Sequence, residues 1–224
     1  MKTAVLIHGC HLQAKDWENI IWGDPQNGVW GRASKGLQVA IREKPELIYW
    51  GTSASEKNGI KEAQYTFDYA LSHVKDLEYF KRRDVQDIEQ SLHRVSFIDM
   101  ETQNTPQETR RAMEMCRDRG IERLVLVSSP THVARCLQSA ERVRAEGGFE
   151  GLEILATASD TCFADSTPAD VLIVEPPHRG DRPEVPIHET LKLTMRFRKE
   201  SFEVASAFNE DLAKFIQGWK YKTK

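Results

Sequence analysis

Leu124-Val125-Leu126-Val127-Ser128-Ser129-Pro130-Thr131-His132 is the stretch that decides the fold of this chain. A short apolar run that ends in turn residues is typical of a strand buried on both faces of a sheet. Ser129 or Thr131 starts a helix directly afterwards, and Gly147-Gly148 ends it. A buried strand that leads at once into a helix predicts a βαβ unit.

Similar apolar runs recur along the chain. They lie at Ala4–His8, Leu47–Trp50, Val95–Ile98, Leu152–Leu155 and Val171–Val174. Helical patterns separate them. One apolar stripe has helical spacing, formed by Ala63, Phe67, Ala70, Leu71 and Val74. Thr105-Pro106-Gln107-Glu108 predicts a capping box for another helix, which Gly120 closes. This alternation predicts an α/β fold in three layers, αβα, with a mostly parallel central sheet of about five or six strands.

The length of 224 residues suits one domain, with a core at about residues 4–175 and a C-terminal extension, 176–224, packed on it. In the extension we expect an edge strand at Lys192–Phe197 and a closing helix at Phe208–Trp219. The formal net charge is −3, which argues against a nucleic-acid or membrane partner. The first residues are too short an apolar run for a signal peptide, and no later run approaches a membrane span.

The four cysteines are scattered, with no CxxC pair. Cys116 and Cys136 fall in helical patterns, where a buried free thiol is the usual interpretation. We expect a soluble, cytoplasmic protein. The sequence leaves the oligomeric state open.

Small and polar residues follow nearly every predicted strand. Because ligands of open parallel sheets bind outside the carboxyl ends of the strands, these positions predict the site. Free backbone N–H groups and helix N-termini there favour an anionic or nucleotide-like small molecule. The residues expected to bind it are Gly9, Cys10, Arg32, Gly51, Thr52, Ser53, Asn104, Thr105, Ser128, Ser129 and Arg135.

Several motifs come in a characteristic order. They are Arg32-x-x-x-Gly36-Leu37, Glu62-Ala63, Asn104-Thr105-x-x-Glu108 and Val127-Ser128-Ser129-Pro130-Thr131-His132-x-x-Arg135. In this order, from about residue 4 to about residue 175, the chain resembles the YdcF/SanA/ElyC-like family. The resemblance implies a Rossmann-like fold, and some relatives are reported to bind S-adenosylmethionine, which makes it a candidate cofactor.

This chain departs from the family pattern in two respects. The family usually has glycine-rich turns after its first two strands, and here they read His8-Gly9-Cys10-His11 and Gly51-Thr52-Ser53. SanA-like and ElyC-like members also carry membrane anchors, which we do not find here. These departures leave open whether the ligand is that of the relatives, and they argue against a role at the cell envelope.

His132 and Arg135 share one face of the predicted helix. An arginine at a helix N-terminus opposes the macrodipole and needs a compensating anion, so it either binds the ligand or pairs with a nearby carboxylate while His132 caps the helix. Glu62 stands in a first helical turn, where an acid is favourable for dipole reasons alone. The resemblance favours a ligand or catalytic carboxylate there.

Arg32 is either solvated or clamps a phosphate or carboxylate. Asn104 and Thr105 are explained as a turn and N-cap, which does not exclude binding. His8 and His11 are too few for a zinc site, so we expect no metal. Trp17, Trp22 and Trp30 surround one loop and either pack in the core or form a lid over a ring.

Two classes of function fit these residues. The first is an enzyme, a transferase or hydrolase, that acts on a phosphorylated, nucleotide-like or S-adenosyl-type molecule, with His132 and Glu62 as the catalytic groups that move protons. The second is a binding or regulatory module that uses the same cleft without chemistry. Catalysis requires a titrating His132, whereas binding requires only its hydrogen bond.

Overall fold

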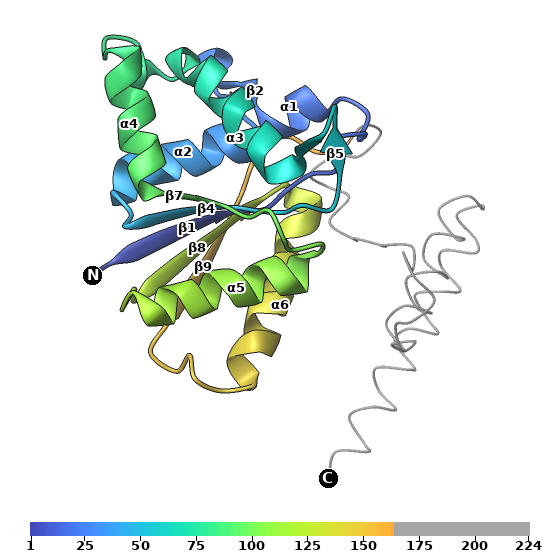
Figure 1. Cartoon of the computed structure of the whole chain (residues 1–224), viewed down its shortest axis with the longest axis vertical. Helices are drawn as coiled ribbons and strands as arrows, with labels where there is room; N and C mark the ends of the chain where they lie inside the picture. Colours follow the sequence, from blue (N-terminus) through green and yellow to red (C-terminus); the bar gives the residue numbers. More distant parts are fainter. Residues whose placement is uncertain (164–224) are drawn as a thin grey trace, which may run out of the picture. The chain divides into compact units, whose positions relative to one another are not determined.

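The central sheet of this computed structural model, which describes residues 1–163, has five parallel strands in the order β7-β4-β1-β8-β9 (Figure 1). The strands are β1 (Thr3–Ile7), β4 (Leu47–Trp50), β7 (Ser96–Ile98), β8 (Arg123–Ser128) and β9 (Glu153–Ala158). At the centre of the sheet, Ile7 of β1 is paired with Trp50 of β4 on one side and with Val127 of β8 on the other. The expected α/β, Rossmann-like fold with a parallel sheet is confirmed.

The predicted strands match the structure closely at the centre of the sheet and less well at its edges. The strand predicted at 152–155 is too short, because β9 extends to Ala158. Val95, predicted as the first residue of a strand, belongs to the helix before β7. The predicted elements at Val171–Val174, Lys192–Phe197 and Phe208–Trp219, and the extension 176–224, lie outside the described residues.

The order of the strands creates a switch point between β1 and β8. From β1 the chain builds outward through β4 to β7, and it then returns to place β8 on the other side of β1. The helices that follow β1 and β8 therefore leave on opposite faces of the sheet, so that their starts meet at the carboxyl ends of these strands. In open α/β sheets this is where ligands bind.

Helices cover both faces of the sheet (Figure 1). On one side lie α2 (Arg32–Glu43), α3 (Glu62–His73) and α4 (Val85–Val95), and on the other α5 (Thr105–Asp118) and α6 (Pro130–Ala145). Successive residues of a strand point to opposite faces, so Val5 joins the core under α2 and Leu6 the core under α5 and α6. All residues of β1 are buried, as expected for a central parallel strand.

The connection from β1 to α2 is a folded insertion with α1 (Trp17–Ile21), β2 (Gly23–Asp24), η1 (Pro25–Asn27) and β3 (Val29–Trp30). Trp17 and Trp22 are buried and make edge contacts with Tyr69 of α3, and Trp17 also contacts Tyr65. These two tryptophans are packing residues, so they do not form a lid that stacks a ring.

Short elements complete the second and third connections. A hairpin of β5 (Glu56–Lys57) and β6 (Ile60–Lys61) precedes α3, and the 3-10 turns η2 (Val74–Asp76) and η3 (Glu78–Phe80) follow it. Among the described residues no helix has the length and apolar character needed to cross a membrane. Cys116 and Cys136 are buried free thiols, as predicted.

The capping box predicted at Thr105-Pro106-Gln107-Glu108 is wrong. Asn104 is the N-cap of α5, and its side-chain oxygen accepts from the backbone N–H of Gln107 at 3.0 Å. Thr105 is already the first helical residue. The Glu108 side chain turns into the protein, where it meets His8. The buried contact with His8 thus determines the position of the Glu108 side chain, in place of the local capping pattern.

Gly36 on α2 is a point of close approach to β1. A Cβ atom at this position would lie 2.4 Å from Cδ1 of Ile7. We expect Gly36→Val to lower the free energy of unfolding by about 1–3 kcal/mol, the usual cost of overpacking a core. Urea unfolding measures the change. Gly151→Ala is the control, because a Cβ atom added at Gly151 would have no other atom within 4 Å among the described residues. Equal stability of Gly36→Val and wild type would contradict this close packing.

Candidate functional site

The predicted site residues converge on the carboxyl ends of β1, β4 and β8, although they are far apart in the chain. Arg32, the first residue of α2, reaches across the switch point, and its Nε donates to Ser129 Oγ at 2.7 Å. Its Nη1 donates to the carbonyl of Gly9 and, at 3.5 Å, to that of His8. One guanidinium therefore joins the end of β1 to the starts of α2 and α6.

Arg32 is buried, with 1% of its surface exposed, which excludes the solvated alternative. Among residues 1–163 no carboxylate forms an ion pair with it, and its Nη2 has no hydrogen-bond partner. Its guanidinium carbon lies 5.3 Å from the centre of the Phe163 ring. A buried charge without an ion-pair partner is costly, and the N-terminus of α2 adds positive potential. The arrangement favours an anion beside Arg32.

The N-terminus of α6 opens onto the same point. Ser129 is its N-cap, but the side chain makes no capping hydrogen bond, since its oxygen accepts from Arg32. The hydroxyl of Thr131, in the first turn, is buried and without a hydrogen-bond partner among the described residues. A helix start of this kind is a ready site for an anion.

Glu62 is the first residue of α3 and is 1% exposed. Its Oε2 accepts a hydrogen bond from the Ser55 hydroxyl at 2.6 Å. The Ser55 oxygen in turn accepts from the backbone N–H of Leu12 at 2.9 Å. Its Oε1 lies against Gly9, where a Cβ atom would come within 2.2 Å of it. Burial, with the charge of Glu108, raises the pKa of Glu62 to about 7. A carboxyl group of this kind can both accept and donate a proton near neutral pH.

His8 and Glu108 form a buried pair that sequence reasoning missed as site residues. Nδ1 of His8 lies 2.6 Å from Oε1 of Glu108, and Oε2 of Glu108 occupies the space beside Gly51, where a Cβ atom would lie 2.0 Å away. Burial by itself lowers the pKa of His8, but Cys136 and Glu108 beside it raise that pKa to about 10. The imidazolium therefore donates to the carboxylate.

A signal for Glu108 was present in the sequence. It falls on the apolar stripe of α5, whose buried positions follow helical spacing at Thr105, Glu108, Thr109, Ala112, Met113 and Cys116. An acid on the core face of a helix needs a buried partner. His8 had a weaker signal, its position at the end of a fully buried strand.

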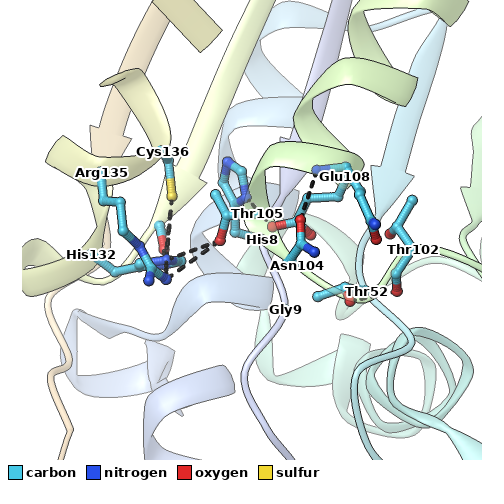
Figure 2. Close-up of polar contacts among 12 residues, drawn as sticks. His8, Gly9, Thr52, Thr102, Asn104, Thr105, Glu108, His132, Arg135 and Cys136 are labelled. Carbon is cyan, nitrogen blue, oxygen red and sulfur yellow. Dashed lines mark hydrogen bonds and ion pairs between the residues drawn. The ribbon is translucent and has the colours of Figure 1, made fainter. Parts of the chain in front are cut away.

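His132 lies between α5 and α6 (Figure 2). Its Nδ1 is 2.7 Å from Ser128 Oγ, and its Nε2 contacts Arg135 Nη2 and lies 3.4 Å from Thr105 Oγ1. Arg135 Nη2 also donates to Thr105 Oγ1 at 3.4 Å. Burial and the positive charges of Arg32, Arg135 and His8 hold the pKa of His132 well below its usual range. The imidazole is neutral at pH 7.

The other predicted ligand residues make contacts within the protein. The Thr52 and Ser53 hydroxyls donate to the carbonyls of Thr102 and Asp99, at 2.8 and 2.7 Å. Asn104 caps α5. Burial raises the pKa of the Cys10 thiol, which keeps it protonated. These side chains therefore hold the loops after the strands in place, and the backbone groups of the loops remain at the candidate site.

No group of three metal-ligating side chains lies together within residues 1–163. His8 faces Glu108, whereas His11 is exposed. An open surface hollow of about 740 Å³ lies at α4, lined among others by Arg82, Arg83, Arg94, Asp84 and Asp87. None of the residues that line this hollow belongs to the candidate site, and its charges are mixed.

The raised pKa of Glu62 predicts a pH dependence of stability. Because the folded value, about 7, exceeds the ordinary 4.5, the stabilising contribution is complete below pH 4.5 and is lost as the pH rises through 7. Relative to Glu62→Gln, which cannot ionise, we expect the wild-type free energy of unfolding to fall by about 3 kcal/mol at most over this range. Urea unfolding at several pH values measures it. Parallel curves for the two proteins would contradict the raised pKa.

Comparison with family models, with curated proteins and with solved structures finds no match to this chain. The resemblance to the YdcF/SanA/ElyC-like family therefore stays a prediction that rests on the motifs. Since a fold of this kind hosts many unrelated activities, the function has to be argued from the site itself.

Proposed function

We propose that this chain is an enzyme that acts by hydrolysis or group transfer on a phosphorylated or nucleotide-like small molecule bound at the carboxyl ends of the strands. The observation that carries the proposal is Arg32, a fully buried cation that has no ion pair among the described residues and lies between two helix N-termini. A phosphate group would supply the missing negative charge, and the planar guanidinium suits its geometry.

The choice of an enzyme over a binder depends on Glu62. A binding module needs charge and hydrogen bonds that complement the ligand, and a carboxyl group with a pKa near 7 adds nothing to the binding of an anion. Proton transfer, in contrast, is most efficient when the pKa lies near the working pH. Glu62 is therefore proposed to move protons near neutral pH, and His132, which is neutral at pH 7, is proposed to act as a base, while Arg32 and Arg135 hold the anion. An S-adenosyl-type ligand has a cationic sulfonium and fits this positive site less well.

Ligand binding is expected to depend on the two arginines. A thermal-shift series with orthophosphate, pyrophosphate, nucleotides and S-adenosyl compounds identifies the ligand, because binding raises the melting temperature by mass action. We expect Arg32→Gln and Arg135→Ala to weaken binding by about 1–3 kcal/mol each, the scale of a hydrogen bond to a charged group. Arg142→Ala, an exposed position on α6, is the control and keeps wild-type affinity. Unchanged affinity in folded arginine variants would reject the anion site.

Catalysis is expected to depend on the proton-transfer groups. With a substrate from that series, His132→Gln and Glu62→Gln should each lower turnover by at least about 100-fold while affinity stays within a few-fold. Steady-state rates and direct binding measurements separate the two effects. If both variants lose binding and activity in equal proportion, the residues are anchors, and the binding or regulatory module replaces the enzyme.

A further inference from the structure

The contacts of His132 determine which of its ring nitrogens carries the proton. A guanidinium has N–H donors and no acceptor, so Arg135 Nη2 can only donate to Nε2 of His132. The neutral ring then has its proton on Nδ1, from which it donates to Ser128 Oγ at 2.7 Å. Arg135 and Thr105 both lie on the Nε2 side of the ring, and Figure 2 shows the three side chains together.

This arrangement leaves His132 without a lone pair for catalysis. Nδ1 has no lone pair because it is protonated, and the lone pair of Nε2 is engaged by Arg135. Ser128 receives a hydrogen bond from the ring, so His132 cannot remove the proton of the Ser128 hydroxyl in this state. His132 can therefore act as a base through Nε2 only after Arg135 has moved away from this nitrogen.

A bound anion provides a reason for Arg135 to leave. Hydrogen bonds from a guanidinium to a phosphate oxygen are charge-assisted and about twice as strong as those to a neutral acceptor. Thr105 Oγ1, another contact of Nη2 within residues 1–163, is also a neutral acceptor, at 3.4 Å. A phosphate oxygen near α6 thus competes successfully for the same N–H groups.

We propose that Arg135 blocks the Nε2 of His132 in the free protein, and that an anionic group of the ligand releases this nitrogen by drawing the guanidinium to itself. The inference rests on the proposed function. Once released, Nε2 takes a proton from a water or alcohol nucleophile, whose O–H bond electrons stay on the oxygen. The ring becomes an imidazolium, with Nδ1–H still bound to Ser128. The base thus becomes available only when the ligand is in place.

The charges around His132 indicate that its pKa reports whether Arg135 has left Nε2. Burial and then Arg32, Arg135 and His8 hold its pKa below the usual range, and the Cys136 sulfur lies 3.5 Å from Nδ1. Of the charged groups, Arg135 is the one in contact with Nε2, whereas the neutral Thr105 Oγ1 lies 3.4 Å and the Cys136 sulfur 3.8 Å from this nitrogen. Removing Arg135, or moving it onto an anion, is expected to raise the pKa of His132, whereas the other groups stay in place.

The experiment is ¹⁵N NMR of the histidine side chains across a pH titration, with His132→Gln to identify the signals. For the free wild type we expect one neutral tautomer, protonated on Nδ1, with a pKa below 6.5. In Arg135→Ala the pKa should rise by about one unit or more, and Nε2 should show the chemical shift of an unbonded nitrogen. Saturating orthophosphate should move the wild type in the same direction. Arg142→Ala should match the wild type.

The outcomes separate this inference from the proposed function. If orthophosphate raises the melting temperature but leaves the His132 signals unchanged, the anion site stands and the release of Nε2 is rejected. An Arg135→Ala variant with wild-type His132 signals rejects the blocking contact itself. If no phosphate compound binds, the proposed function fails, and the release step fails with it.

Discussion

Burial of the Arg32 guanidinium removes a permanent charge from water at the point where β1 and β8 meet. The group is held by the carbonyls of His8 and Gly9 and by the hydroxyl of Ser129, which are neutral acceptors. Such contacts satisfy hydrogen bonds without cancelling the charge. This side chain fixes the end of β1, the first residue of α2 and the start of α6 to one another, so the geometry of the candidate site depends on it.

The carboxyl groups of the site depend on space that two glycines leave open. Glu62 Oε1 fills the position of a Cβ at Gly9, and Glu108 Oε2 does so at Gly51. Buried carboxyl groups that lie near each other cannot both ionise easily. Glu108 is paired with the His8 imidazolium, and Glu62, which has only hydrogen bonds from neutral groups, is the one whose pKa rises. Burial and the same crowding therefore raise the pKa of Glu62, which has no charged hydrogen-bond partner among the described residues.

The positive groups act on the histidines in a similar way. His8 is held charged by its acidic neighbour, whereas His132 is held neutral by burial and by Arg32, Arg135 and His8. In the proposed enzyme, an anion that drew Arg135 to itself would change the balance at His132, because Arg135 contacts the His132 ring. The proposal thus couples ligand binding to proton transfer through one side chain.

The sequence by itself determined the layered fold and the end of the sheet at which the candidate residues gather. Buried strands and capped helices follow from local patterns, and parallel strands bring their carboxyl ends to one edge. Arg32, Glu62, Ser128 and His132 were found from these patterns and from the motifs. The pair of His8 with Glu108, the blocked Nε2 of His132 and the roles of Thr52 and Ser53 as supports of the loop were decided only by the tertiary structure. These depend on distances between residues far apart in the chain, and burial, which sets their protonation, does not exist before the chain folds.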